Sequence, residues 1–316
     1  MGWFGKSRKK AEPTKPPMPR RMPLGGAPRP EPQGENHLIV VILDSLRWDS
    51  FMAAEPAAIM RLGKVERRYS YASWTAPSHY NLLTGLLPHT SPEHVYASEY
   101  YKEDFFNYNQ RLGSKGIDFG AMVPGLWLPE FLQNKLGYQT HARVSLPVLN
   151  PKTAINRGFD SFQLMDKHND MRSMFPTLKF DSNRPSFYLL NVGETHYPYA
   201  CPDEDSSMWP RISGVNGVFR KMNDQIQAKG YGSERFKEEF QFFDQDKLDQ
   251  LRERQIHTVR YLDGVFEELF DLVPKNTHII VTADHGELFG EGGYFGHGPI
   301  MHDKCFEVPY LEGRIR

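Results

Sequence analysis

Three apolar segments of the chain each end in side chains that could bind a metal ion or transfer a proton. These endings are Asp44 after 38–43, Glu194 and His196 after 187–192, and Asp284 and His285 after 279–281. Short continuous apolar runs predict strands that are buried on both faces of a parallel sheet. Ligands bind such sheets at the carboxyl ends of the strands, so the three endings predict one shared site at that edge.

The pair Asp284-His285 has two interpretations. A charged Asp and a His directly after an apolar strand are costly to bury unless they are paired or bound to a metal ion. The alternative is that Asp284 caps a following helix and that His285 is adjacent by chance. Beyond this pair, "GEGGYFGHG" supplies glycines that let the backbone approach a ligand closely. It also contains His297, which could be a ligand or an ordinary loop histidine.

Another candidate lies in "SYASWTAPSHYNLLTG", residues 70–85, which reads as a helix start followed by an apolar face. Thr75 could be the N-cap of that helix, with Pro77 in its first turn. Alternatively, Thr75 is a nucleophile at a helix N-terminus, where backbone N–H groups and the helix dipole favour an anion. This stretch alone leaves both interpretations open.

Strands and helices alternate along the chain. This alternation predicts an α/β fold, a three-layer α/β/α sandwich around a mostly parallel sheet. The other expected elements are a short helix within 55–69, a helix over 127–136 followed by a strand, a helix within 233–243, and a long amphipathic helix over 244–273.

The composition is typical of one large globular domain. Of the 316 residues, 39% are hydrophobic and 24% are charged, and the formal net charge of -1 gives no field that would attract nucleic acid. The two cysteines, Cys201 and Cys305, could pair but do not form a disulfide framework. No apolar segment is long enough to span a bilayer and none resembles a secretory signal, so we expect a cytoplasmic protein.

Residues 1–36 are basic and rich in proline and glycine. They cannot bury enough apolar surface to fold, so we expect a disordered tail before a catalytic domain over 37–316. Trp3 and Phe4 stand beside several basic residues and could touch an anionic membrane surface. A solvated basic tail is the alternative.

Six motifs occur in the order seen in the alkaline phosphatase superfamily, and they most resemble its sulfatase and phosphoethanolamine-transferase branch. The motifs are "VVILDSLRWD", "SWTAPSHYNLLTG", "LPEFLQNKLGYQT", "RGFDSF", "FYLLNVGETHYPY" and "TADHGELFGEGGYFGHG". The resemblance runs from about His37 to Pro309. It implies the alkaline-phosphatase-like fold, and it leads us to expect a C-terminal subdomain that is short or absent.

The resemblance also implies a metal site. The residues that match the family's ligands are Asp44, Thr75, Asp284 and His285. They would hold one divalent ion, with Zn²⁺ or Mn²⁺ favoured, Mg²⁺ or Ca²⁺ as alternatives, and a second metal ion left open. The ion would activate the hydroxyl of Thr75, because free threonine is a poor nucleophile at neutral pH.

Two further histidines match substrate-contacting positions of the family. His196 corresponds to a histidine that contacts the substrate or its leaving group. His297 corresponds to a lysine or histidine that binds a substrate oxygen, and a histidine there can also act as a general acid.

The chain departs from the sulfatases at the nucleophile. Those enzymes carry Cys-x-Pro-Ser-Arg and convert the first residue to formylglycine, whereas this chain has Thr75-Ala76-Pro77-Ser78-His79. Threonine cannot give formylglycine, and His79 would replace the substrate-binding arginine. Ser45 also follows Asp44 where sulfatases usually have a second acid. These departures favour phosphate esters over sulfate esters.

We therefore expect a metal-dependent hydrolase or transferase that forms a phosphothreonine at Thr75. Its substrate would be a small-molecule, lipid or glycan phosphoester, and we expect no nucleic-acid partner. The alternatives are a sulfatase without formylglycine and a non-catalytic binding protein on the same fold.

Overall fold

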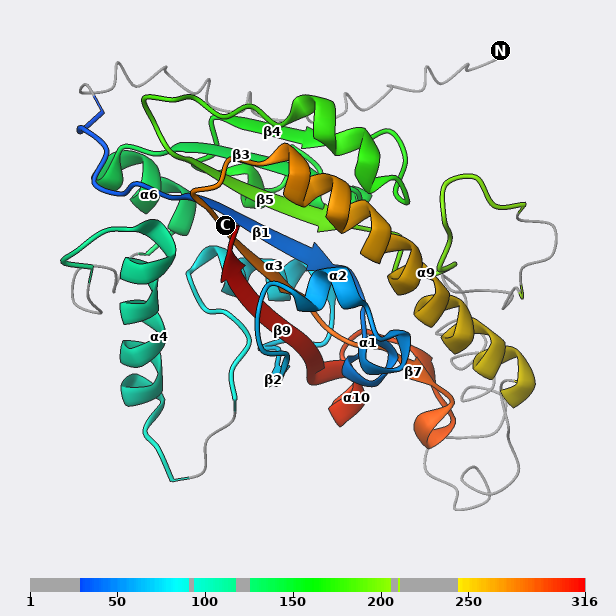
Figure 1. The fold of residues 1–316 in the computed structure, drawn as a ribbon. Coiled ribbons are helices and arrows are strands. Elements are labelled where there is room, and N and C mark those ends of the chain that lie inside the picture. The colour runs from blue at the N-terminus through cyan, green and yellow to red at the C-terminus, as the bar shows by residue number, and fades with distance from the viewer. Residues whose placement is uncertain (1–28, 91–93, 118–125, 206–209, 211–243, 316) are drawn as a thin grey trace, which may run out of the picture.

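A computed structural model describes residues 29–90, 94–117, 126–205, 210 and 244–315. In this part of the chain the main sheet has seven strands in the order β2-β9-β6-β1-β5-β3-β4 (Figure 1). The strands are β1 (His37–Leu43), β2 (Glu66–Tyr69), β3 (Gln139–Val144), β4 (Ser161–Leu164), β5 (Ser186–Val192), β6 (Thr277–Thr282) and β9 (Glu307–Arg314).

Strand β1 lies near the centre of this sheet and pairs in parallel with both β5 and β6. Val41 is opposite Leu190 on one side and Val281 on the other, and every residue of β1 is buried. A strand covered on both faces has no solvent side, so its sequence is continuously apolar rather than alternating. Within this sheet, the antiparallel pairs among the described strands are those of β9 with β2 and with β6.

The helices form a layer on each face of the sheet (Figure 1). They are α1 (Trp48–Ala54), α2 (Ala57–Met60), α3 (Thr75–Leu83), α4 (Ala97–Leu112), α6 (Leu128–Leu136), α9 (Gln245–Leu272) and α10 (Asp303–Phe306). Side chains of α1, α2 and α9 pack with Ile39, Val41 and Leu43, whereas those of α3, α4 and α6 pack with Leu38, Val40 and Ile42. Successive β1 side chains therefore pack into the hydrophobic cores on opposite faces of the sheet. The predicted three-layer α/β/α sandwich is confirmed.

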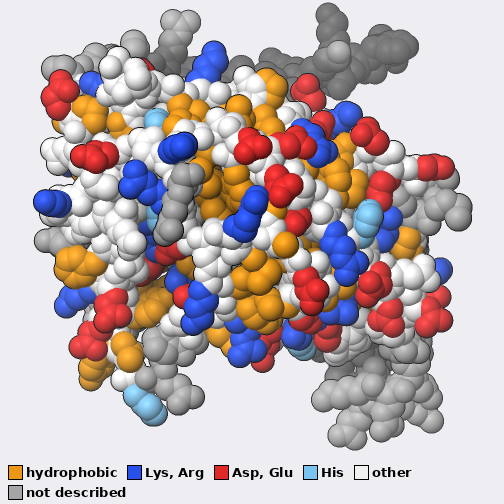
Figure 2. Space-filling model, in the orientation of Figure 1, with side chains coloured by type: hydrophobic (Ala, Val, Ile, Leu, Met, Phe, Trp, Pro, Cys, Tyr) orange, Lys and Arg blue, Asp and Glu red, His pale blue; other side chains and the backbone are white. Residues whose placement is uncertain are grey.

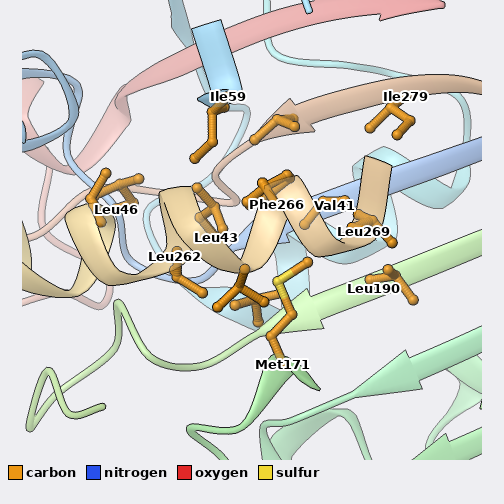
Figure 3. Close-up of a cluster of buried hydrophobic side chains, with 14 of the residues drawn as sticks. Val41, Leu43, Leu46, Ile59, Met171, Leu190, Leu262, Phe266, Leu269 and Ile279 are labelled. Carbon is orange, nitrogen blue, oxygen red and sulfur yellow. The ribbon is translucent and has the colours of Figure 1, made fainter. Parts of the chain in front are cut away.

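Helix α9 supplies much of one core. Leu262, Phe266 and Leu269 recur at helical spacing and face Val41 of β1 and Ile279 of β6 in Figure 3. Asp244 caps the helix start by accepting a hydrogen bond from the backbone N–H of Asp246. The packing of α9 against the sheet matters for the site, because this helix also carries side chains that contact the loops at the strand ends.

The structure differs from the expected elements near one edge of the sheet. Residues 66–69 form strand β2 rather than the end of a helix, and they pair with β9. The Arg68 guanidinium lies 3.4 Å from the centre of the Tyr310 ring and adds a cross-strand side-chain contact to this pairing. Strand β9 was not predicted, because Pro309 and its polar C-terminal half do not resemble a buried strand.

Two other expectations concern residues outside the described ranges, wholly or in part. The helix expected within 233–243 and residues 1–28 of the predicted tail lie outside them. Residues 29–36 pack against the domain: Gln33 and Glu35 donate backbone hydrogen bonds to the carbonyls of Leu136 (3.1 Å) and Leu112 (3.0 Å). The division of the chain at residue 36 stays a prediction.

Two short elements complete the part that positions the site. Strands β7 (Leu288–Phe289) and β8 (Phe295–Gly296) form a small antiparallel hairpin beside the carboxyl edge of the sheet. None of the helices in the described ranges is both long and apolar enough to cross a membrane. Acidic and basic side chains are interspersed over the face shown in Figure 2.

Candidate active site

The ends of β1 and β6 bring two carboxylates and a histidine together. Asp44 directly follows β1. Asp284 and His285 follow β6 after one intervening residue. All three are buried, and one ligand atom from each lies within 4.8 Å of the others. The parallel pairing of β1 with β6 accounts for this, because it places the two carboxyl ends side by side.

Asp44 is held by its neighbours on both strand ends. The Asn191 amide donates to one carboxylate oxygen (2.8 Å) and the Ser45 hydroxyl to the other (3.1 Å). Burial would raise the pKa of Asp44, but electrostatic interactions with His196, His285 and His79 and the Asn191 hydrogen bond outweigh it and hold the pKa below its ordinary value. Asp44 is therefore the carboxylate that stays ionised.

Asp284 is only half satisfied. Its Oδ1 accepts backbone N–H bonds from Ser45 (3.1 Å) and His285 (3.0 Å). Its Oδ2 is buried and has no hydrogen-bond partner among the described residues. Burial, followed by the charge of Asp44, raises the pKa of Asp284 well above its ordinary value.

His285 presents a lone pair to this orphaned oxygen. Its Nδ1 donates to the carbonyl of Gly286 (2.8 Å), which can only accept, so Nε2 carries no proton in the neutral ring. Nε2 lies 3.4 Å from Asp284 Oδ2 and 3.3 Å from Thr75 Oγ1. Ligands of a tetrahedral zinc ion are about 3.3 Å apart for bonds of about 2.0 Å. The donor set therefore fits a divalent cation.

Thr75 does not cap its helix. Helix α3 begins at Thr75, and Trp74 occupies the N-cap position without a side-chain cap hydrogen bond. The Thr75 hydroxyl is directed instead to Nε2 of His285, and the residue is only 5% exposed. The capping interpretation is wrong, and the hydroxyl belongs to the group at the strand ends.

His79 lies one turn further along α3 and behind Thr75. Its Nδ1 donates to the Thr75 carbonyl (2.9 Å) and lies 3.7 Å from Asp284 Oδ2. Burial lowers the pKa of His79, and its Nε2 is buried without a hydrogen-bond partner in the described ranges. The geometry supports a role in positioning Thr75, while the predicted contact between His79 and substrate stays a prediction.

His297 reaches the same site from the end of the β7–β8 hairpin. The centre of its ring lies 4.3 Å from that of His285 and 5.4 Å from that of His196. Its Nδ1 pairs with Oε1 of the buried Glu287 (3.1 Å), and Tyr199 donates its hydroxyl proton to the other Glu287 oxygen. Burial would lower the pKa of His297, but Glu287 raises it above its ordinary value.

His196 and Glu194 point in different directions from the loop after β5. His196 donates from Nδ1 to the carbonyl of Tyr197 (3.0 Å), which leaves Nε2 free to meet a substrate. Glu194 instead accepts the backbone N–H of Met171 (2.7 Å), and burial raises its pKa to about 7. Of the two residues that mark this strand end, His196 therefore joins the site.

Two residues that hold the site in place were not among those expected from the sequence. Gln255 of α9 donates to the carbonyls of Ser45 (3.0 Å) and Thr195 (3.1 Å), and so ties two strand-end loops together. Nothing local in the sequence marks Gln255. Glu287, by contrast, stands two residues after His285 and could have been recognised as its neighbour in the site.

The family of the chain follows from its sequence. A family model described as Sulfatase matches residues 36–311, most of the chain. The chain belongs to the sulfatase family. This family is part of the alkaline phosphatase superfamily, whose members use divalent metal ions, and the buried Asp44, Asp284 and His285 group agrees with that chemistry. No curated protein sequence matches the chain.

Similar solved structures have the same fold at low sequence identity. The C-terminal periplasmic domain of EcEptC from Escherichia coli, in complex with Zn, is 11% identical; the match covers 91% of this chain and 74% of that one, with a TM-score of 0.50. A 2-O GAG sulfatase is 12% identical (89% and 65%, TM-score 0.51). The phosphonate monoester hydrolase of Agrobacterium radiobacter is 14% identical (88% and 68%, TM-score 0.50).

Proposed function

We propose that this sulfatase-family protein is a metal-dependent phosphoester hydrolase or phosphotransferase that works through a phosphothreonine at Thr75. The observation that carries the proposal is the direction of the Thr75 hydroxyl. Thr75 is the first residue of α3 rather than its N-cap, and its Oγ1 lies 3.3 Å from His285 Nε2, beside two buried carboxylates.

In this proposal Asp44, Asp284, His285 and the Thr75 oxygen hold the divalent ion. Asp284 would release its proton when the ion binds, so that two ionised carboxylates would balance the charge of a divalent cation, and the cation would satisfy the orphaned Oδ2 of Asp284. When bound, the ion would lower the pKa of the Thr75 hydroxyl so that it loses its proton, and would neutralise charge on the transferring group. Zn²⁺ and Mn²⁺ suit this oxygen and nitrogen donor set.

In this proposal each residue of the site has a separate role in the reaction. Thr75 Oγ1 forms a bond to phosphorus as the bond between phosphorus and the leaving oxygen breaks. The leaving alkoxide takes a proton from His297, which Glu287 keeps protonated to higher pH, or from His196. Water or an acceptor alcohol then attacks phosphorus and gives its proton to the histidine that was deprotonated in the first step, as the bond between phosphorus and Thr75 Oγ1 breaks. The acceptor, water or alcohol, determines whether the reaction is a hydrolysis or a transfer.

Phosphate is preferred over sulfate because of Thr75 itself. A sulfothreonine has no formylglycine hydroxyl with which to expel sulfate, so turnover of sulfate esters should stall. A phosphothreonine can be cleaved by attack at phosphorus, aided by donors at the helix N-terminus. The similar structures include both a sulfatase and a phosphonate monoester hydrolase, so the fold alone accommodates either ester.

The substrate would be a small-molecule, lipid or glycan phosphoester in a cytoplasmic setting. The cytoplasmic location rests on the sequence alone. Membrane contact by Trp3 and Phe4 concerns residues outside the described ranges. A sulfatase without formylglycine remains the rival activity, and the same assay separates the two.

The test compares aryl phosphates, phosphodiesters and aryl sulfates at one metal concentration. We expect turnover of phosphate esters well above sulfates, its abolition in Thr75→Ala, and a phosphorylated Thr75 peptide by mass spectrometry after acid quench. His196→Ala and His297→Ala should each lower turnover by roughly 10²–10⁴-fold with the metal retained. A preference for sulfates, or full activity of Thr75→Ala, would overturn the proposal.

A further inference from the structure

A second group of metal-ligating side chains lies where the loop after β5 meets α9. Cys201 and Glu204 come from the loop, and His257 comes from the middle of α9. One donor atom from each lies within 4.8 Å of the others. These residues are separate from the Asp44 group, and that group contains no sulfur ligand.

Glu204 is oriented as a ligating carboxylate would be. Its Oε2 accepts the backbone N–H of Cys201 (3.0 Å) and a hydrogen bond from Arg254 Nη2 (2.6 Å). Arg254 is anchored in turn by the carbonyl of Tyr199 (2.7 Å). The other carboxylate oxygen of Glu204, Oε1, lies 3.2 Å from His257 Nε2. Metal-bound carboxylates are held by outer hydrogen bonds in a similar way.

We propose that Cys201, Glu204 and His257 form a second zinc site, independent of the function proposed above. A thiolate, a carboxylate and an imidazole are the ligand types that zinc takes in proteins. Cys201 is buried, whereas the Glu204 and His257 side chains are 25% and 57% exposed. This opening gives the ion an entry path and leaves room for water as a fourth ligand.

The charge balance of the site requires release of a proton. A thiol loses its proton when it binds zinc, so binding would exchange that proton for the ion. Thiolate and carboxylate would then cancel the charge of Zn²⁺. The bound ion would fasten the loop that carries His196 to α9.

Cobalt substitution tests the site directly, because a cobalt–thiolate bond gives a near-ultraviolet charge-transfer band. The metal-free full-length protein is titrated with Co²⁺. We expect two equivalents to bind, one of which produces the band. Cys201→Ser should lose the band and one equivalent, whereas Asp284→Asn should keep the band and lose the other equivalent. Cys305→Ser, which removes the other buried free cysteine, serves as the matched control.

His257→Ala guards against misfolding of the Cys201 variant, because His257 is exposed on α9 and its removal leaves no cavity in the core. It should lose the same band while keeping the wild-type circular dichroism spectrum. A wild-type titration without the band, a band that survives in Cys201→Ser, or a band lost in Cys305→Ser would each overturn the proposal. None of these outcomes bears on Thr75.

Discussion

Asp284→Asn should change the stability of the protein in opposite directions with and without metal. In the metal-free protein, Oδ2 of Asp284 is a buried acceptor without a hydrogen-bond partner among the described residues, and Asp44 stands nearby. Asparagine keeps the shape and the two N–H bonds to Oδ1, and its amide can donate to His285 Nε2, now 3.4 Å away. The substitution therefore replaces a buried titratable group, one oxygen of which lacks a hydrogen-bond partner among the described residues, without opening a cavity.

The size of each effect follows from that geometry. Relief of one unsatisfied buried group stabilises by about 1–3 kcal/mol. At about 2 °C per kcal/mol for a chain of this size, the metal-free variant should melt about 2–6 °C above the wild type. A metal at about 100 times its Kd adds about 2.7 kcal/mol to the wild type, or about 5 °C, and Asp284→Asn should lose this gain.

The metal-free difference should also depend on pH. The raised pKa of folded Asp284 means that its contribution to stability is fully present below the unfolded pKa of about 3.9 and is lost as pH rises through the folded pKa. Asparagine does not titrate. The advantage of Asp284→Asn should therefore be larger at about pH 7.5 than at about pH 5.5.

Thermal melts in chelator and in excess Mn²⁺ measure both effects. Mn²⁺ is chosen because it favours oxygen ligands over the thiolate of Cys201. Asp166→Asn, an exposed acid, is the control and should shift stability by less than about 0.5 kcal/mol. The reasoning fails if Asp284→Asn melts below the wild type in chelator, or if Mn²⁺ still raises its melting temperature by the wild-type amount.

Three other changes test the remaining geometry. Thr75→Ser keeps a hydroxyl and should exceed the turnover of the alanine variant by at least about 10²-fold in an aryl phosphate assay. Glu287→Gln should lower kcat by about 10–100-fold and move the basic limb of the pH profile to lower pH, because His297 loses the carboxylate that raises its pKa. Phe266→Ala should cost about 3–5 kcal/mol in urea unfolding, whereas exposed Leu272→Ala should cost less than about 0.5 kcal/mol.

Much of the fold could be predicted because its strongest patterns are local. The apolar run of β1 and the amphipathic period of α9 reflect burial on two faces and on one face, so each type of element is readable without its partners. Strands β2 and β9 were missed for the opposite reason. Each is stabilised by pairing with the other across more than two hundred residues of sequence, and neither has an apolar period of its own.

The candidate site likewise contains residues that could be predicted from the sequence and residues that could not. Asp44, Asp284 and His285 follow predicted parallel strands, so the topology alone required them to meet at one edge. The contribution of a residue distant in sequence could not be predicted. Gln255, in the middle of α9, bridges the loops after β1 and β5.

The class of fold and the residue types at the strand ends are readable from the chain alone, because burial and strand polarity act along short stretches of sequence. Which groups those residues contact depends on the packing of segments that are distant in sequence. The Thr75 hydroxyl could cap a helix or face His285, and both choices obey the same local pattern. In the folded chain the hydroxyl lies beside His285, and His79 of the same helix lies beside Asp284, so the start of α3 adjoins the residues that follow β6. The opposite pKa shifts of Asp44 and Asp284 likewise arise from burial and neighbouring charge, which no local sequence encodes.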